Sequence, residues 1–193
     1  MYGIVFRDFL SVLFIGITIK FLDDIIDAEM DKTNGKINWF NYVGTGILPY
    51  IFILFSLAVI FNKNLTIPLF LSAYVVGMGK EYSSRYLLGI VGWTESLIII
   101  TIVVIFFGWQ NGLTSLAVLL AIQLVDDLID HSRDRETGEK NFVTLWGSGE
   151  VIIICGILIM AALFYSAYKL FLVMLAYLVI TIFLDKTPWK EAI

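Results

Sequence analysis

The sequence has few charged residues and a single cysteine, unlike most soluble or disulfide-bonded proteins. Only 16% of its 193 residues are charged, whereas an ordinary soluble domain is about 25% charged. It has one cysteine, Cys155, so no internal disulfide can form, and the apolar run around it predicts a buried packing thiol. Arg7 and Asp8 lead into apolar residues without a small-residue cleavage site, so we expect no cleavable signal peptide. These shortages argue against a soluble globular domain.

The sequence is rich in apolar residues, and they form long runs. Hydrophobic residues make up 59% of the chain and the mean hydropathy is +0.88. A membrane-spanning helix needs about 20 such residues, and lipid offers the backbone no hydrogen-bond partners, so the spans must be helices. The sequence therefore predicts an all-α polytopic transmembrane helix bundle, forming one domain over residues 1–193. We expect seven spans, in the apolar segments Ile4–Leu22, Val43–Phe61, Ile67–Gly79, Thr94–Trp109, Leu113–Val125, Val151–Tyr165 and Leu170–Leu184.

The basic residues predict how this bundle is oriented. With seven spans, alternate connections lie on the same side of the membrane, and the side richer in lysine and arginine is cytoplasmic. One side receives only Arg7, Lys63 and Lys169. The other receives ten basic residues: Lys20, Lys32, Lys36, Lys80, Arg85, Arg133, Arg135, Lys140, Lys186 and Lys190. We therefore expect an integral protein of the cell membrane with its N-terminus outside and its C-terminus inside.

Two clusters of acidic residues follow apolar segments on the predicted cytoplasmic side. The first carboxylate motif is Asp23, Asp24, Asp27 and Asp31, and the second carboxylate motif is Asp126, Asp127, Asp130 and Asp134. Both read D-D-x-x-D-x-x-x-D, at a constant offset of 103 residues. The match continues through Lys32 with Arg135, Gly35 with Gly138, and Asn38 with Asn141. Residues 20–41 and 123–144 thus form an internal repeat, and we expect them to share a local structure.

The spacing within each motif aligns carboxylates along a helix. Positions i, i+4 and i+8 stay on one helical face, so Asp23, Asp27 and Asp31 form one stripe, as do their counterparts in the second motif. Solvated helix ends are the simplest explanation, but two matched stripes on one side favour a hard divalent cation. Mg²⁺ takes one or two carboxylates and completes its octahedron with water and phosphate oxygens. The net charge of −4 comes mostly from the two motifs and argues neither for nor against nucleic acid. We expect no nucleic-acid partner.

These motifs resemble those of the UbiA-type intramembrane prenyltransferases. The family's first motif, N-D-x-x-D-x-x-x-D, is matched by Asp24, Asp27 and Asp31, with Asp23 in place of the usual asparagine. Its second motif is similar to Asp127, Asp130, Asp134, Gly138 and Lys140, followed by "NFVTLWG". A looser match is "GKEYSSRYLLG", which contains Lys80 and Arg85. The family usually has nine helices with the first motif on the second, whereas this chain has seven apolar segments with the first motif after the first.

The resemblance implies an enzyme that moves a prenyl group within the membrane. It implies Mg²⁺ held by Asp23, Asp24, Asp27, Asp31, Asp126, Asp127, Asp130 and Asp134, with six of these, Asp24, Asp27, Asp31, Asp127, Asp130 and Asp134, as catalytic residues. It also implies a prenyl diphosphate donor, whose phosphate oxygens would contact Lys80, Arg85, Arg133, Arg135 or Lys140. The acceptor is not readable from the sequence. A homo-oligomer would be one way to replace the missing helices.

Several alternatives remain open at this point. A catalytically silent protein that binds a prenyl lipid fits the same motifs, and so does a cation-coupled carrier, which would need ionisable residues deep within its spans. His131, inside the second motif, is expected to be a solvated interfacial side chain rather than a metal ligand. Glu95 opens an apolar segment, where its charge favours a helix N-terminus, or else it faces a cavity. Tyr42, Tyr50, Tyr74, Tyr82 and Tyr86 are candidates for shielding an allylic cation or for ordinary packing.

Overall fold

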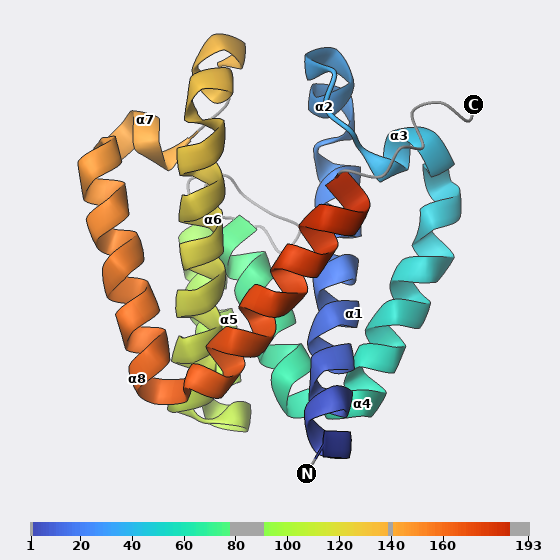
Figure 1. Cartoon of the computed structure of the whole chain (residues 1–193), viewed down its shortest axis with the longest axis vertical. Helices are drawn as coiled ribbons and strands as arrows, with labels where there is room; N and C mark the ends of the chain where they lie inside the picture. Colours follow the sequence, from blue (N-terminus) through green and yellow to red (C-terminus); the bar gives the residue numbers. More distant parts are fainter. Residues whose placement is uncertain (1, 78–90, 139–140, 186–193) are drawn as a thin grey trace. The chain divides into compact units, whose positions relative to one another are not determined.

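The structure is a computed structural model that describes residues 2–77, 91–138 and 141–185. Every regular element within these residues is helical (Figure 1). The elements are α1 (Tyr2–Ile26), α2 (Ala28–Asn34), α3 (Trp39–Val43), the 3₁₀ turn η1 (Gly44–Gly46), α4 (Ile47–Gly77), α5 (Gly92–Phe107), α6 (Trp109–Thr137), α7 (Phe142–Trp146), α8 (Ser148–Ile180) and the π-helical turn η3 (Thr181–Asp185). The all-α prediction is therefore confirmed for the part of the chain that the structure describes.

Three long helical stretches are apolar enough to cross a membrane: residues Trp39–Gly77, Trp109–Ser132 and Ser148–Leu184. α5 is apolar but shorter, with 16 residues. In the most apolar part of the first and third stretches only 17% of the residues are buried, so large aliphatic and aromatic side chains face outwards. A surface of this kind is stable in lipid rather than in water. The chain is a helical membrane protein.

The two longest helices are each interrupted by one residue. Asn62 in α4 has φ −158° and ψ 93°, and Ser166 in α8 has φ −161° and ψ 81°. Unbroken, α4 would extend about 46 Å, well beyond the roughly 30 Å hydrocarbon core. The interruptions fall between the second and third predicted segments and between the sixth and seventh. All seven predicted segments lie largely on helices, except that residues 78–79 are outside the described part.

Two predicted boundaries are wrong because glycines end helices there. The second segment was expected to begin at Val43, but α4 begins at Ile47, since Gly44 adopts a φ of 63° and ends α3. The fourth segment was expected to include Trp109, but Gly108 has a φ of 84° and separates α5 from α6. Trp109 opens α6 instead. The fifth segment also ends later than expected, because α6 continues through the second carboxylate motif to Thr137.

The chain forms two compact units. Unit 1 comprises Met1–Ile67 and Phe171–Ile193, and unit 2 comprises Pro68–Leu170. The chain passes from unit 1 to unit 2 within α4 and returns within α8. Both units contain the same succession: a long helix with a carboxylate motif near its end, a left-handed glycine, a short helix and a long apolar helix (Figure 1). The glycines are Gly35 and Gly138, with φ of 67° and 75°, where a side chain would be strained.

Polar side chains stabilise each helix interruption. In unit 1, Asn62 Oδ1 accepts the backbone N–H of Asn64 at 3.0 Å, and its Nδ2 donates to Asp8 Oδ1 at 2.8 Å. In unit 2, Ser166 Oγ accepts the N–H of Lys169 at 3.3 Å, and Lys169 Nζ donates to the backbone and side-chain oxygens of Asn111 and to Ser115 Oγ. These side chains act as N-caps that restart the helices.

Candidate functional site

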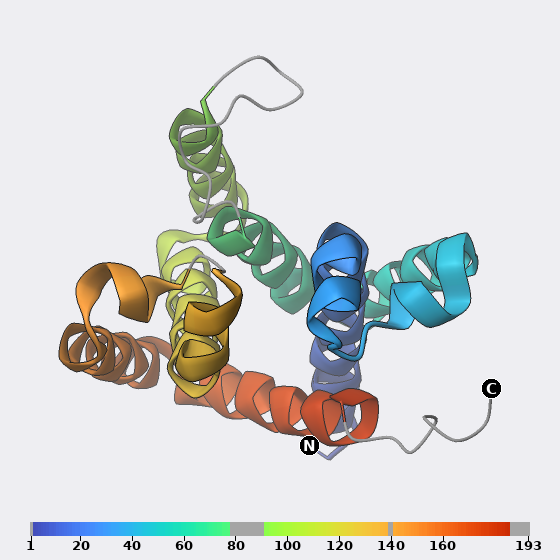
Figure 2. The ribbon, with the colours of Figure 1, turned by 90° about the horizontal axis from the view of Figure 1, so that it is seen from above.

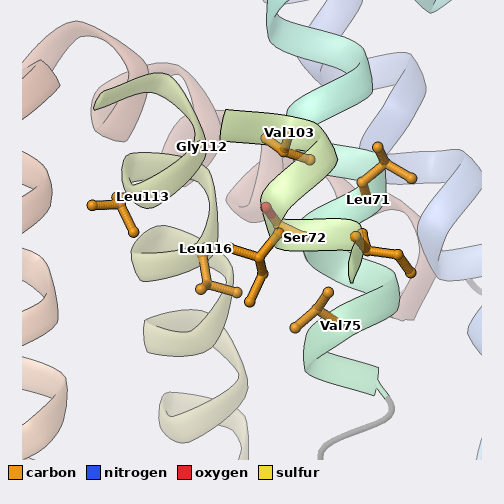
Figure 3. A pocket seen from close by; sticks show the side chains of 9 residues that line it. Leu71, Ser72, Val75, Val103, Gly112, Leu113 and Leu116 are labelled. Atoms are coloured by element: carbon orange, nitrogen blue, oxygen red, sulfur yellow. The ribbon is translucent and has the colours of Figure 1, made fainter. Parts of the chain in front are cut away.

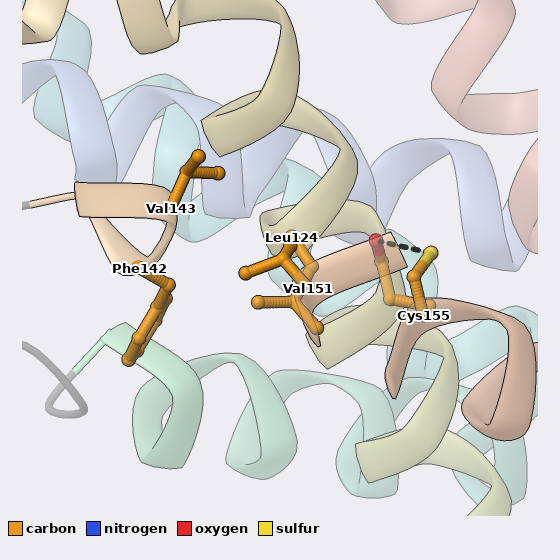
Figure 4. Close-up of a cluster of buried hydrophobic side chains, with 6 residues drawn as sticks. Leu124, Phe142, Val143, Val151 and Cys155 are labelled. Atoms are coloured by element: carbon orange, nitrogen blue, oxygen red, sulfur yellow. Dashed lines mark hydrogen bonds between the residues drawn. The ribbon is translucent and has the colours of Figure 1, made fainter. Parts of the chain in front are cut away.

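The second carboxylate motif lies near the end of α6, on a rigid part of unit 2. Leu124, Phe142, Val143 and Val151 form a buried apolar cluster between α6, α7 and α8, together with Ala121 and Cys155 (Figure 4). Cys155 is buried, as predicted, and its thiol lies 3.8 Å from the carbonyl oxygen of Ala121. Leu124 lies two residues before Asp126, the first residue of the motif. This packing holds α7 beside the end of α6 (Figure 2), and it fixes the position of the carboxylates.

One asparagine ties the second motif to the loop that follows it. Asn141 Nδ2 donates to the backbone oxygen of Asp127 and to Oδ2 of Asp134, both at 2.8 Å. The backbone N–H of Phe142 donates to Asp127 Oδ2 at 2.7 Å. Asn141 Oδ1 also accepts the N–H of Val143 at 2.7 Å and so caps α7. We call this network of Asp127, Asp134, Asn141 and Phe142 the second asparagine lock.

Unit 1 contains the same network around the first motif. Asn38 Nδ2 donates to the backbone oxygen of Asp24 at 2.7 Å and to Oδ2 of Asp31 at 2.8 Å. The N–H of Trp39 donates to Asp24 Oδ2 at 3.0 Å, and Asn38 Oδ1 caps α3 by accepting the N–H of Asn41 at 3.2 Å. We call Asp24, Asp31, Asn38 and Trp39 the first asparagine lock. Three of these four hydrogen bonds have direct counterparts in the second lock, whereas Asn38 caps the third residue after it and Asn141 caps the second.

In the second aspartate of each motif, both carboxylate oxygens have a partner within the protein. Asp24 Oδ1 pairs with Lys20 Nζ at 3.1 Å, one helical turn earlier, while its Oδ2 belongs to the first asparagine lock. Asp127 Oδ1 accepts from Gln123 Nε2 at 2.9 Å, and its Oδ2 belongs to the second lock. Both carboxylates are almost fully buried, with 1% and 3% of their surface exposed. Buried carboxylates with two engaged oxygens hold a backbone in place.

The predicted stripes keep their helical spacing. In α6 the helix is continuous through Asp126, Asp130 and Asp134. In unit 1 α1 ends at Ile26 and α2 begins at Ala28, yet Asp27 N–H still donates to Asp23 O at 2.9 Å and Asp31 N–H to Asp27 O at 2.8 Å. Asp23 is exposed, and Asp27, Asp126 and Asp130 are partly exposed. Each stripe therefore has at least two carboxylates that are partly exposed or exposed near the end of a long helix, whereas Asp134 in the second stripe is buried.

The stripes offer the oxygen ligands that a hard cation needs. Carboxylate oxygens suit Mg²⁺ better than they suit softer metals, which prefer imidazole or thiolate. Among the described residues, no group of three acidic, histidine or cysteine side chains is gathered closely enough to hold a metal by itself. Mg²⁺ bound at one stripe would thus rely on phosphate and water oxygens for most of its coordination.

The other predicted site residues are placed only in part. Lys80, Arg85 and Lys140 lie outside the described residues, as do Tyr82 and Tyr86, and the side chain of Arg133 is not described. Arg135 is exposed in the last turn of α6, and Glu29 and Glu136 are exposed close to the motifs. His131 is half-buried, and its Nδ1 atom is buried without a hydrogen bond from the described residues, so the prediction of a solvated side chain is only partly met.

Sequence reasoning missed the role of the asparagines. Asn38 and Asn141 appeared only as one more matching position of the repeat, whereas they connect two aspartates of each motif to the next helix. The signal was present, because an asparagine at the same offset after a left-handed glycine is a frequent helix cap. Lys20 and Gln123, which engage the second aspartates, also occupy matching positions.

Comparison of the chain with family models, with curated proteins and with solved structures found no match.

Proposed function

We propose that this membrane protein is a magnesium-dependent prenyltransferase of the UbiA type, which transfers a prenyl group from an allylic prenyl diphosphate to an acceptor within the membrane. One observation carries the proposal: the same asparagine lock is built twice, and each copy presents a carboxylate stripe at the end of a long apolar helix. Solvated helix ends need no such locks. Carboxylate stripes at the ends of long apolar helices suit a ligand with a charged head and an apolar tail.

The locks divide the eight aspartates into two functional groups. Asp24 and Asp127 hold the chain in place and are positioning residues, since both of their oxygens already have partners. The stripe residues Asp23, Asp27 and Asp31, with Asp126, Asp130 and Asp134, would hold Mg²⁺. In Asp31 and Asp134 the Oδ2 atom is engaged by the lock asparagine, which orients the carboxylate and directs Oδ1 elsewhere.

The proposed reaction needs the diphosphate to leave with the electron pair of the allylic C–O bond. Bound magnesium would neutralise the charge that develops on the departing oxygens. Asp27 and Asp130 would each be a cation ligand in their own motif, and Arg135, exposed in the last turn of α6, would donate charge-assisted hydrogen bonds to phosphate. Lys80, Arg85, Arg133 and Lys140 are proposed to do the same. Water must be kept from the allylic cation, and the apolar helices that precede the motifs supply that exclusion.

The proposed orientation puts both motifs at the cytoplasmic face of the cell membrane, with seven crossings of the bilayer. The short helices α3 and α7 support a location at the membrane surface, because they expose aromatic and aliphatic side chains beside the polar locks. Tyr42, Leu145 and Trp146 are 50%, 69% and 48% exposed. Side chains of this type collect where lipid headgroups meet the hydrocarbon. The carboxylates next to them would then meet a diphosphate at headgroup depth.

A carrier is less well supported by the same contacts. A cation-coupled carrier needs ionisable side chains that face a path through the spans. Among the described residues, the buried ionisable side chains away from the motifs are Asp8 and Lys169, and both are hydrogen-bonded at the helix interruptions. These hydrogen bonds indicate that both side chains stabilise the fold. The carboxylate motifs remain the place where a ligand is expected.

The proposal is tested by turnover of purified protein in detergent. We expect diphosphate release from geranyl, farnesyl or geranylgeranyl diphosphate with a lipid extract as acceptor source, and we expect it only when Mg²⁺ is added. Prenylated products are identified by mass. Release that continues in excess EDTA, or no release with any of the three donors, would refute transferase activity. If none of the donors releases diphosphate, tight magnesium-dependent binding of a donor would indicate a catalytically silent prenyl-lipid-binding protein.

A further inference from the structure

Trp39 connects the first asparagine lock to the turn that follows α8. Its backbone N–H donates to Asp24 Oδ2 at 3.0 Å, and its indole Nε1–H donates to the backbone oxygen of Leu184 at 3.3 Å. The indole ring also lies beside Phe21 of α1, with the two ring centroids 6.5 Å apart. Leu184 belongs to η3, the π-helical turn. One residue therefore contacts both the first lock and a segment 145 residues later in the sequence.

The end of α8 packs closely against α1 before the chain reaches η3. A Cβ atom added to Gly16 would lie 2.5 Å from Ile180 Cδ1, so the two helices approach each other at this point. Ile180 lies about one turn before Leu184, and Gly16 lies about two turns before the first lock. All of these residues belong to unit 1. The position of η3 is therefore set by α1 on one hand and by Trp39 on the other.

Unit 2 has no equivalent link among its described residues. Phe142 occupies the position that matches Trp39, and its phenyl ring has no N–H to donate. An apolar pocket of unit 2, between α4, α5 and α6, encloses about 10 Å³, which is room for about one water molecule (Figure 3). A ligand in this pocket therefore cannot supply such a link. The described contacts connect η3 to the first motif and not to the second.

We propose that η3 regulates the first carboxylate motif through Trp39. In a π-helical turn the hydrogen bonds span five residues instead of four, and such turns are frequent at functional sites. While η3 keeps this form, Leu184 accepts the indole N–H, and the backbone of Trp39 holds Asp24 in the lock. When η3 rewinds or frays, the indole loses its acceptor, the lock loosens, and the first motif binds magnesium and diphosphate more weakly.

The coupling is reciprocal, because a ligand that favours the locked form must stabilise η3 by the same factor. The effect on ligand affinity rests on the proposed function. The link between the first lock and η3 does not, and it is measured without any ligand.

The test breaks η3 and the indole hydrogen bond separately. Ile182→Pro disrupts the turn at a side chain that is 55% exposed, and Trp39→Phe removes the indole N–H but keeps an aromatic ring. Amide hydrogen exchange of residues 28–43 is measured in the full-length protein in detergent, without ligand. We expect either change to speed this exchange about 2- to 10-fold, the effect of losing one neutral hydrogen bond. The double variant should add less than about twofold, because both changes break the same link.

Two matched controls should leave the exchange of residues 28–43 within about twofold of the wild-type protein. Ile182→Ala changes the same side chain without breaking the turn, and Trp146→Phe changes an exposed tryptophan beside the second lock. Unchanged exchange in Ile182→Pro, or independent effects that add in the double variant, would overturn the proposal.

A second measurement adds Mg²⁺ and farnesyl thiodiphosphate. We expect the bound analogue to slow exchange of residues 180–185 about 2- to 10-fold in the wild-type protein and to leave it unchanged in Trp39→Phe. Binding of the analogue that leaves these residues unaffected in the wild-type protein would also overturn the proposal. If the analogue fails to bind while the ligand-free variants show the coupling, the proposed function fails and the link between η3 and the first lock stands.

Discussion

Replacing Asp27 or Asp130 by asparagine is expected to slow magnesium-dependent diphosphate release by about 100- to 1,000-fold, the usual effect of removing one group that stabilises charge in the transition state. Both residues lie at the middle of their stripes and are partly exposed. The hydrogen bonds that define the locks use Asp24, Asp31, Asp127 and Asp134 instead. The amide has nearly the size of the carboxylate, so the substitution removes the charge and one oxygen ligand with little change in packing.

The control variants remove a negative charge close to each motif without removing a proposed magnesium ligand. Glu29→Gln and Glu136→Gln remove one negative charge close to each motif, and both side chains are exposed. We expect them to alter the rate less than about threefold and all four variants to unfold within about 0.5 kcal/mol of the wild-type protein. Equal losses of activity in the aspartate and glutamate variants would indicate a general electrostatic effect rather than metal binding.

Asn141→Ala is expected to destabilise the protein by about 3–5 kcal/mol. The substitution removes both donor hydrogen bonds of a side chain that is only 1% exposed, leaves Asp134 Oδ2 and the backbone oxygen of Asp127 without that donor, and removes the cap of α7. Asn38→Ala removes the equivalent bonds in unit 1 and should have a similar effect. Unfolding is followed by circular dichroism in detergent during denaturant titration.

The conservative variant Asn141→Asp distinguishes a donor role from simple packing. Aspartate has nearly the same shape but cannot donate from the Nδ2 position, and it brings a negative charge beside Asp134. We expect it to be at least as destabilising as alanine. Thr33→Ala, which loses an exposed hydrogen bond to Glu29, should cost less than about 1 kcal/mol. A stable Asn141→Asp variant would show that the lock does not hold the motif in place.

The sequence predicted the parts of this protein that depend on local pattern. Apolar runs identified the helices, and the gaps between the second and third and between the sixth and seventh runs contain Asn62 and Ser166, where two of the long helices are interrupted. The constant offset between the motifs predicted that Asn38 and Asn141 would occupy equivalent positions. Helix ends were missed by a few residues at Gly44 and Gly108, because a positive φ depends on the backbone and not on hydropathy.

The motif pattern alone could not predict which aspartates stabilise the fold and which are proposed to bind magnesium. Asp24 and Asp27 look alike in sequence, yet Asp24 is buried and paired on both oxygens, whereas Asp27 is partly exposed. The difference arises from a contact with Trp39, fifteen residues away, which forms only after the chain turns at Gly35. Contacts of this range depend on tertiary packing, and helical periodicity contains no information about them.

The account depends on the carboxylate stripes binding a magnesium–diphosphate group. Equilibrium dialysis of radiolabelled farnesyl thiodiphosphate against the wild-type, Asp27→Asn and Asp130→Asn proteins, with and without Mg²⁺, tests this directly. We predict that the wild-type chain binds the analogue only with Mg²⁺ and that each substitution lowers the affinity by at least about 100-fold. Binding that needs no Mg²⁺, or full affinity in both variants, would contradict the account.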